Sequence, residues 1–101
     1  MSLKKQYTLT KPICKVTFKL AKDDINGANR VYLAGDFNNW DIESIPMKKL
    51  KSGEYTISID LEKGKEYQFK YVIDGMKWIN ETEADKYVPN QFLTENSVVV
   101  V

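Results

Sequence analysis

The side chains that could bind or transform a ligand are aromatic residues, lysines, amides and carboxylates, because this 101-residue chain contains no histidine. Ser-His-Asp and Cys-His nucleophile systems and histidine metal sites are therefore excluded, and we expect no metal and no cofactor. Carboxylates cluster at 23–24 and 81–85. A glycosidase needs two of them across a cleft, which a domain of this size rarely builds. We interpret these acids as solvated turn residues and predict that the protein is not an enzyme.

Trp40 lies in GDFNNW, residues 35–40, a segment otherwise typical of a surface loop. Phe37 is better placed to fill the interior beneath the loop, so we predict that Trp40 is exposed. An exposed indole suits a sugar ring, a nucleobase or a partner protein. Sugar rings pack their C–H face on an indole, while their hydroxyls reach amide and ammonium groups. Asn39, next to the tryptophan, is such an amide.

A second tryptophan follows a predicted hairpin turn. In YQFKYVI, residues 67–73, the aromatic residues share one face of a predicted strand. Lys70 then points outward, and the ordinary interpretation is a solvated lysine. DGMK, residues 74–77, opens with Asp-Gly, the strongest short hairpin signal, and Trp78 would begin the returning strand. Trp78 could equally be a core residue, because buried tryptophans are common in β-sandwiches.

Alternation of apolar and polar residues indicates strands rather than helices. The predicted strands are 14–22, 30–35, 47–50, 55–61, 67–73, 78–79 and 96–101. Residues 22–30, with an Asn-Gly pair, are expected to form a turn, and 80–95 to be irregular. About seven short strands predict an all-β fold, an immunoglobulin-like antiparallel β-sandwich, with a small barrel as the alternative. We expect a single domain over 1–101, with 1–12 as a loosely ordered lead-in.

The composition is that of an ordinary globular domain, with 43% hydrophobic and 29% charged residues. A net charge of +1 gives no general attraction to nucleic acid or anionic membranes, so we expect neither as a partner. Cys14 is the single cysteine, which suits a reducing compartment, and we expect a cytoplasmic location. Residues 1–12 contain no apolar run typical of a signal peptide or a membrane span.

Four motifs in order resemble carbohydrate-binding module family 48. They are VYLAGDFNNW, a proline and a methionine shortly after it, YQFKYVIDGMKW, and a terminal NSVVVV. Relatives include the glycogen-binding domain of the AMP-activated protein kinase β subunit and the N-terminal domains of isoamylases and branching enzymes. The resemblance extends from about residue 14 to residue 101 and implies an immunoglobulin-like β-sandwich. Asn80 and Glu81 stand where many members have Asp-Pro.

The resemblance implies non-catalytic binding of α-1,4-linked glucans such as glycogen, starch or maltooligosaccharides. In glycogen-binding members two tryptophans form a platform for the sugar, and they correspond to Trp40 and Trp78. The lysine of the strand before the Asp-Gly turn corresponds to Lys70. The asparagine that opens the last strand corresponds to Asn96. These roles come from the motif match.

Two further implications of the resemblance concern the end of the chain. A hydrophobic residue that reaches the sugar in some members corresponds to Phe92, with Leu93 as the alternative. Many enzyme-linked members have lost sugar binding and serve as packing domains. The second hypothesis is therefore an interaction module on an amylolytic enzyme or a kinase-type complex. The hydrophobic strand 96–101 would pair with such a partner if it lay at a sheet edge.

Overall fold

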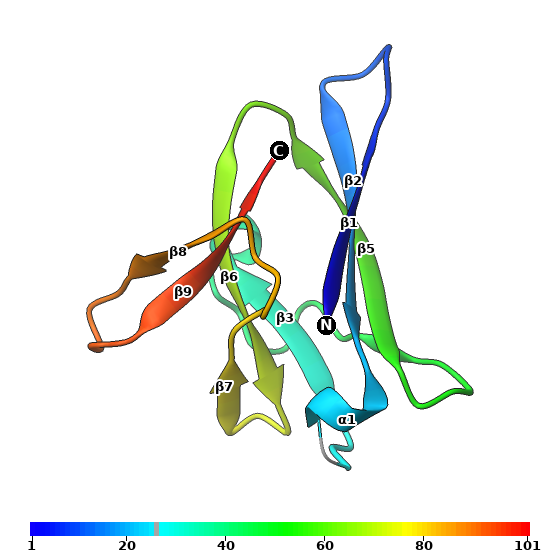
Figure 1. The fold of residues 1–101 in the computed structure, drawn as a ribbon, viewed down its shortest axis with the longest axis vertical. Coiled ribbons are helices and arrows are strands. Elements are labelled where there is room, and N and C mark those ends of the chain that lie inside the picture. Colours follow the sequence, from blue (N-terminus) through cyan, green and yellow to red (C-terminus); the bar gives the residue numbers. More distant parts are fainter. Residues whose placement is uncertain (26) are drawn as a thin grey trace.

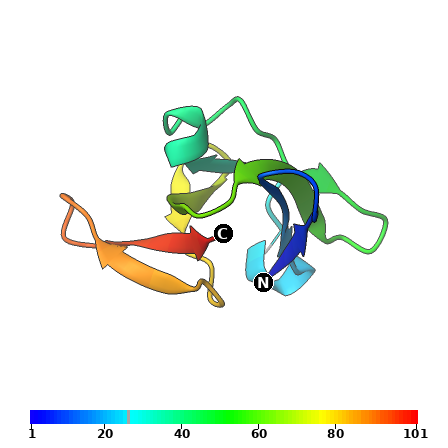
Figure 2. The same cartoon turned by 90° about the horizontal axis from the view of Figure 1, so that it is seen from above.

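The structure, a computed structural model, describes residues 1–25 and 27–101, so Asn26 of the predicted Asn-Gly turn lies outside the described residues. The described residues form nine strands in two antiparallel sheets, which Figure 2 shows as two layers. Among them no two named strands pair across the sheets, and one isolated bridge, Tyr32 to Pro46, joins β3 (Val31–Gly35) to the segment before residues 48–49 of the other sheet. The fold is thus an all-β sandwich, as predicted, and not a closed barrel.

The first sheet has the strand order β1-β2-β5-β4. Its strands are β1 (Ser2–Tyr7), β2 (Ile13–Leu20), β5 (Tyr55–Glu62) and β4 (Lys48–Lys49). β1 pairs with β2 along its whole length, from Ser2 opposite Lys19 to Tyr7 opposite Cys14. Most of the expected lead-in 1–12 is therefore an ordered edge strand. Its polar residues gave no strand signal because the outer side of an edge strand faces water.

The second sheet has the order β3-β6-β9-β8, with the short β7 beside β6. Its strands are β3 (Val31–Gly35), β6 (Glu66–Ile73), β9 (Glu95–Val100), β8 (Lys86–Pro89) and β7 (Lys77–Ile79). β8 lies inside the stretch expected to be irregular, and its hairpin with β9 projects from the body of the molecule (Figure 1). β9 lies between β6 and β8. The terminal strand is therefore not a sheet edge, so the condition for its pairing with a partner is not met.

Aromatic residues fill the space between the sheets. The rings of Phe18 and Phe69 meet edge to face at 5.1 Å, and Phe69 meets Tyr71 at 5.8 Å. All three side chains are fully buried, which contributes about 1.5–3 kcal/mol each. Phe37 packs against Phe18 with ring centroids 6.3 Å apart. The loop of Trp40 is thus anchored to the core by Phe37, as the sequence predicts.

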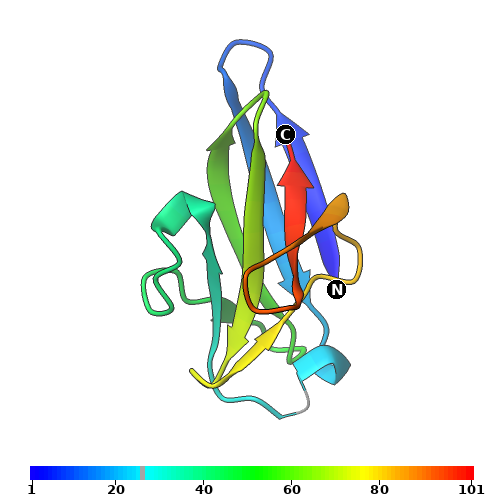
Figure 3. The same ribbon diagram turned by 90° about the vertical axis from the view of Figure 1, so that its left-hand side faces the viewer.

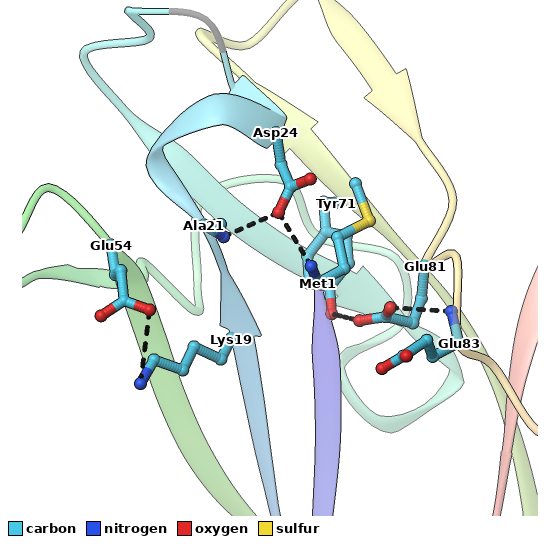
Figure 4. Close-up of polar contacts among 8 residues, drawn as sticks. All are labelled: Met1, Lys19, Ala21, Asp24, Glu54, Tyr71, Glu81 and Glu83. Carbon is cyan, nitrogen blue, oxygen red and sulfur yellow. Dashed lines mark hydrogen bonds and ion pairs between the residues drawn. The ribbon is translucent and has the colours of Figure 1, made fainter.

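In the described part of the chain, two short helical segments interrupt the strands. α1 (Lys22–Ile25) is a single turn within the region expected to be a turn, and the 3₁₀ helix η1 (Asp36–Asn38) follows β3. The carboxylate of Asp24 accepts the Ala21 N–H at 2.7 Å, which satisfies one of the free donors at the start of α1 (Figure 4). No helix in the described part of the chain is long and apolar enough to cross a membrane.

Glu81 is fully buried, so the interpretation of residues 81–85 as a solvated turn is wrong at this position. Its carboxylate accepts the Tyr71 hydroxyl at 2.7 Å and the Glu83 N–H at 3.0 Å (Figure 4). Burial, together with the adjacent Glu81 carboxylate, raises the pKa of the Tyr71 hydroxyl far above its usual range. A buried carboxylate needs such partners, and sequence alone does not place them.

Candidate functional site

An open groove of about 950 Å³ lies against β6, β7 and the loop between β8 and β9. Figure 3 shows these elements on the face toward the viewer. The volume falls within roughly 300–1,000 Å³, the range of small-molecule sites. The groove is lined by Trp40, Gln68, Lys70, Trp78, Asn90, Gln91, Phe92, Thr94 and Asn96. Parts of the chain that are distant in sequence therefore meet at one surface.

Trp40 has a backbone conformation that bulky residues rarely adopt. Its φ is 58° and that of Asn39 is 57°, so two successive residues are left-handed. This conformation costs about 1–2 kcal/mol for a residue other than glycine, though asparagine tolerates it better than most. The side chain of Trp40 is half-buried rather than exposed, and it lines the groove. Such strain persists only where the surrounding structure holds it.

The side chain of Asn38 braces the loop that carries Trp40. Its Oδ1 accepts the Gly35 N–H at 3.0 Å. Its Nδ2 donates to the carbonyl oxygen of Asp41 at 3.0 Å and to the Ser44 hydroxyl at 2.9 Å. The Trp40 N–H in turn donates to the Gly35 carbonyl at 2.9 Å. These bonds close the loop on itself and hold the left-handed turn.

Asp36 connects the indole of Trp40 to the sheet. Its Oδ1 accepts the indole Nε1–H at 3.2 Å, and its Oδ2 accepts the backbone N–H of Gln68 at 2.8 Å. Gln68 lies on β6, two residues before Lys70. One carboxylate therefore sets the orientation of the ring relative to the strand that forms the floor of the groove.

Trp78 reaches the groove through the hairpin turn between β6 and β7. Asp74 and Gly75 have φ values of 51° and 71°, the left-handed pair typical of a tight hairpin. Asp74 also accepts the Arg30 N–H at 2.9 Å, which holds the turn against the start of β3. Trp78 then lies opposite Val72 on β6 and is 43% exposed. It is a surface residue, so the alternative of a core tryptophan is wrong.

The two tryptophans meet as a pair of tilted rings. Their centroids are 6.4 Å apart and their planes make an angle of 41°. Trp40 comes from the loop after β3, and Trp78 comes from β7. Because the planes are inclined, the pair presents a bent apolar surface rather than a flat one.

Polar side chains form the other side of the groove. Lys70 and Asn96 lie there, as the sequence predicts, together with Gln68, Asn90 and Thr94. The Lys70 ammonium donates to the Thr94 hydroxyl at 3.5 Å, a long bond, and has no carboxylate partner among residues 1–25 and 27–101. The groove therefore offers a cation and several amides to a ligand.

The loop between β8 and β9 supplies a third apolar side chain. Phe92 is 74% exposed and lines the groove, whereas Leu93 is 99% exposed and is not among the lining residues. Asn39 is exposed and is not among them either. Its left-handed backbone accounts for the asparagine, and a contact between Asn39 and a ligand stays a prediction.

Sequence reasoning missed Gln68, Asn90, Gln91 and Thr94. Gln68 could have been predicted from the sequence, because the alternation of β6 places it on the same face as Lys70. The other three lie in or beside the β8–β9 hairpin, which was expected to be irregular. No local pattern predicts that this hairpin folds back beside β6.

The described lining residues of the groove are aromatic residues, amides, one lysine and one threonine. None of its described lining residues is a carboxylate. The part of the chain that the structure describes also has no cluster of three histidine, cysteine or acidic residues that could hold a metal ion. The arrangement can bind a ligand with apolar faces and hydroxyl or other polar edges.

No curated protein matches the chain at a significant level. The family model described as the glycogen recognition site of AMP-activated protein kinase matches residues 18–101. The match covers β3 to β9 and the last three residues of β2, and it includes all the described residues that line the groove. The chain therefore belongs to the family of glycogen recognition domains.

Proposed function

We propose that the protein is a non-catalytic module that binds α-1,4-linked glucans in the groove of Trp40 and Trp78. The observation that carries this proposal is the pair of tilted indoles facing a wall of amides and one lysine. Family membership supports glucan binding in general.

The tilt of the indoles favours an α-linked chain. Successive glucose units of an α-1,4-glucan curl into a helix, so their apolar faces are inclined to one another. Planes at 41° suit two such faces, whereas the extended chain of a β-1,4-glucan does not bend in this way. Sugar C–H groups pack on the negative face of the indole. We expect the ring of Phe92 to contact a further unit.

The polar wall suits the hydroxyl groups of the sugar. Lys70 and Asn96 offer donors that fix the register of the chain. The groove is open and sugar hydroxyls must lose bound water, so the expected Kd is about micromolar to millimolar. Several binding units on one polymer would strengthen attachment through avidity.

The absence of carboxylates among the described lining residues supports a binding role over hydrolysis, which needs two carboxylates about 5–9 Å apart. An amylolytic enzyme or a kinase-type complex as a partner stays a prediction. Partner binding by strand addition through residues 96–101 has no support, because β9 is an inner strand.

The test is a titration with maltoheptaose, followed by tryptophan fluorescence and calorimetry, with cellohexaose as the control sugar. Wild-type protein is expected to respond to maltoheptaose only. Trp40→Ala and Trp78→Ala are each expected to bind at least about tenfold more weakly, as for central residues of other interfaces. Tyr7→Ala removes an exposed aromatic residue on β1 and is expected to bind normally. No wild-type response at millimolar maltoheptaose would overturn the proposal.

A further inference from the structure

The polar wall of the groove is a connected chain of side-chain amides. Asn90 Nδ2 donates to Asn96 Oδ1 at 2.9 Å, and Asn96 Nδ2 donates to Gln68 Oε1 at 2.9 Å. Each of the three residues lines the groove. The nitrogen and oxygen ends of an amide have nearly the same shape, so only its hydrogen-bond partners determine which end points where.

The direction of this chain is set at one end by the backbone. Asn90 is half-buried, and its Oδ1 accepts the backbone N–H of Phe92 at 2.9 Å and that of Thr94 at 3.3 Å. A backbone N–H can only donate, so the oxygen of Asn90 must face the loop. Its Nδ2 must then face Asn96, and Asn96 must present its oxygen to Asn90.

The same reasoning orients Gln68. Because Asn96 donates from Nδ2, Gln68 must accept with Oε1. The Nε2 of Gln68 is then left without a partner in the described part of the protein. The ammonium of Lys70 follows two residues later on the same face of β6. At Gln68 and Lys70 the polar wall of the groove therefore presents N–H donors. Ring and glycosidic oxygens of a glucan only accept hydrogen bonds, so N–H donors in the polar wall complement them.

We infer that Asn90 is a positioning residue that sets the hydrogen-bond direction of the groove, and that Gln68 is a ligand-binding residue that donates from Nε2 to the glucan. The inference rests on the proposed function and extends it to two residues that sequence motifs do not mark. Asn90 acts in two ways, since it also holds the loop that carries Phe92.

Asn90→Asp separates these two roles. The aspartate keeps an oxygen for the N–H groups of Phe92 and Thr94, so the loop is expected to keep its shape. A second oxygen replaces Nδ2 and repels Asn96 Oδ1. Asn96 then turns over, Gln68 follows, and Oε1 replaces Nε2 in the groove. We expect maltoheptaose to bind roughly tenfold more weakly, with the melting temperature close to that of wild type.

Gln68→Glu tests the same point without touching the loop. The glutamate still accepts from Asn96 Nδ2 but places an oxygen where the donor was, so a similar loss is expected. Gln6→Glu adds the same charge on exposed β1 and is the control. Titrations are repeated at high salt, since salt screens a general charge effect but leaves the donor exchange intact.

The side-chain amide NMR spectrum distinguishes a role in hydrogen-bond direction from a role in holding the loop alone. In ¹⁵N-edited NMR, the Gln68 Nε2 signals, assigned by their absence in Gln68→Glu, are expected to shift with maltoheptaose in wild type. In Asn90→Asp they are expected to shift already without sugar and to respond little to it. Two results would overturn the inference while the proposed function stands. In the first, wild type binds and both variants bind within twofold of it. In the second, wild type binds but the Gln68 Nε2 signals do not shift when maltoheptaose is added. Absence of wild-type binding overturns both.

Discussion

At the scale of single residues, Trp40 is held in a left-handed conformation that its size disfavours. The hydrogen bonds of Asn38 close the loop, and Asp36 accepts the indole N–H. A side chain held in this way on a strained backbone is pre-organised, so less rotational freedom is lost when a ligand binds. The residues that orient the tryptophan are thus as much part of the site as the ring.

Asp36→Ala is expected to release the indole of Trp40 while leaving the fold intact. Maltoheptaose binding should weaken by roughly three- to tenfold, because the indole loses its charge-assisted hydrogen bond and the backbone N–H of Gln68 loses its acceptor. The chain has two tryptophans, so its NMR spectrum has two indole N–H signals, and Trp78→Phe identifies them. The Trp40 signal should move in Asp36→Ala.

Asp41→Ala is the matched control for this variant. Asp41 lies on the same loop, and its carboxylate accepts the Glu43 N–H rather than the indole. An unchanged Trp40 signal in Asp36→Ala, or an equal change in Asp41→Ala, would show that Asp36 does not orient the ring.

At the scale of elements, the loop of Trp40 depends on a close approach between β3 and β6. A Cβ on Gly35 would lie 2.4 Å from the Gln68 carbonyl oxygen and 2.9 Å from Phe69 Cβ. Its φ of −175° is open to any residue, so the glycine is required by space and not by backbone conformation. The segment after Trp78 is held by hydrogen bonds of the buried Glu81 and not by a close approach of two backbones.

Gly35→Ala is expected to lower the free energy of unfolding by about 1–3 kcal/mol or more, because backbone and core atoms would have to move. Gly64→Ala is the comparison, since Gly64 has φ +81° and no atom within 4 Å of an added Cβ. Its cost should be about 1 kcal/mol, from backbone strain alone. Urea denaturation measures both. A smaller loss for Gly35→Ala than for Gly64→Ala would contradict the overlap argument.

Glu81→Ala is expected to lower the free energy of unfolding by about 1–3 kcal/mol, because the Tyr71 hydroxyl would stay buried without an acceptor. Glu83→Ala, in the same segment but exposed, should cost less than about 0.5 kcal/mol. Adding Tyr71→Phe to Glu81→Ala should recover part of the loss, since the unpaired hydroxyl is removed. Equal stability of the two alanine variants would exclude Glu81 as an anchor.

At the scale of the whole molecule, Asp85 connects the two sheets. Its carboxylate accepts the ammonium of Lys5 on β1 at 2.7 Å and the N–H of Val100 on β9 at 2.7 Å. Partial burial by itself would raise the pKa of Asp85, but the hydrogen bonds from Lys5 and Val100 and the positive charge of Lys5 together outweigh it, so the pKa lies below its usual value. The contact spans the edge strand β1 and the sheet that carries the groove.

A lowered pKa in the folded state makes this contact sensitive to acid. Its contribution to stability is present above the unfolded-state pKa of about 3.9 and is lost as the pH falls through the lower folded-state pKa. We expect urea denaturation between pH 7 and pH 2.5 to show a smaller loss of stability in Asp85→Asn than in wild type. Lys5→Gln should also reduce the loss of stability on acidification, and the double variant should add little to either single change. An identical acid profile in Asp85→Asn would contradict the prediction.

The amino-acid sequence by itself determined the strands that have one buried face. In β2, β5 and β6 apolar and polar residues alternate because one side meets the core, and this pattern is local. The Asp-Gly turn before Trp78 and the inward Phe37 are local in the same sense. Two of the four motifs that carry the family resemblance, VYLAGDFNNW and YQFKYVIDGMKW, include Phe37, β6 and this turn, so the family and the sandwich were predictable.

Only the tertiary structure decided which side chains share the groove. The 41° tilt of Trp40 against Trp78 depends on the packing of two distant segments. β1 is largely polar and β8 has only four residues, and both become strands because neighbouring strands satisfy their backbone groups. The contact of the buried Glu81 with Tyr71 and the contact of Asn96 with Gln68 each join different segments of the chain. Such contacts leave no periodic signal, because each is formed by a single pair of residues that folding brings together.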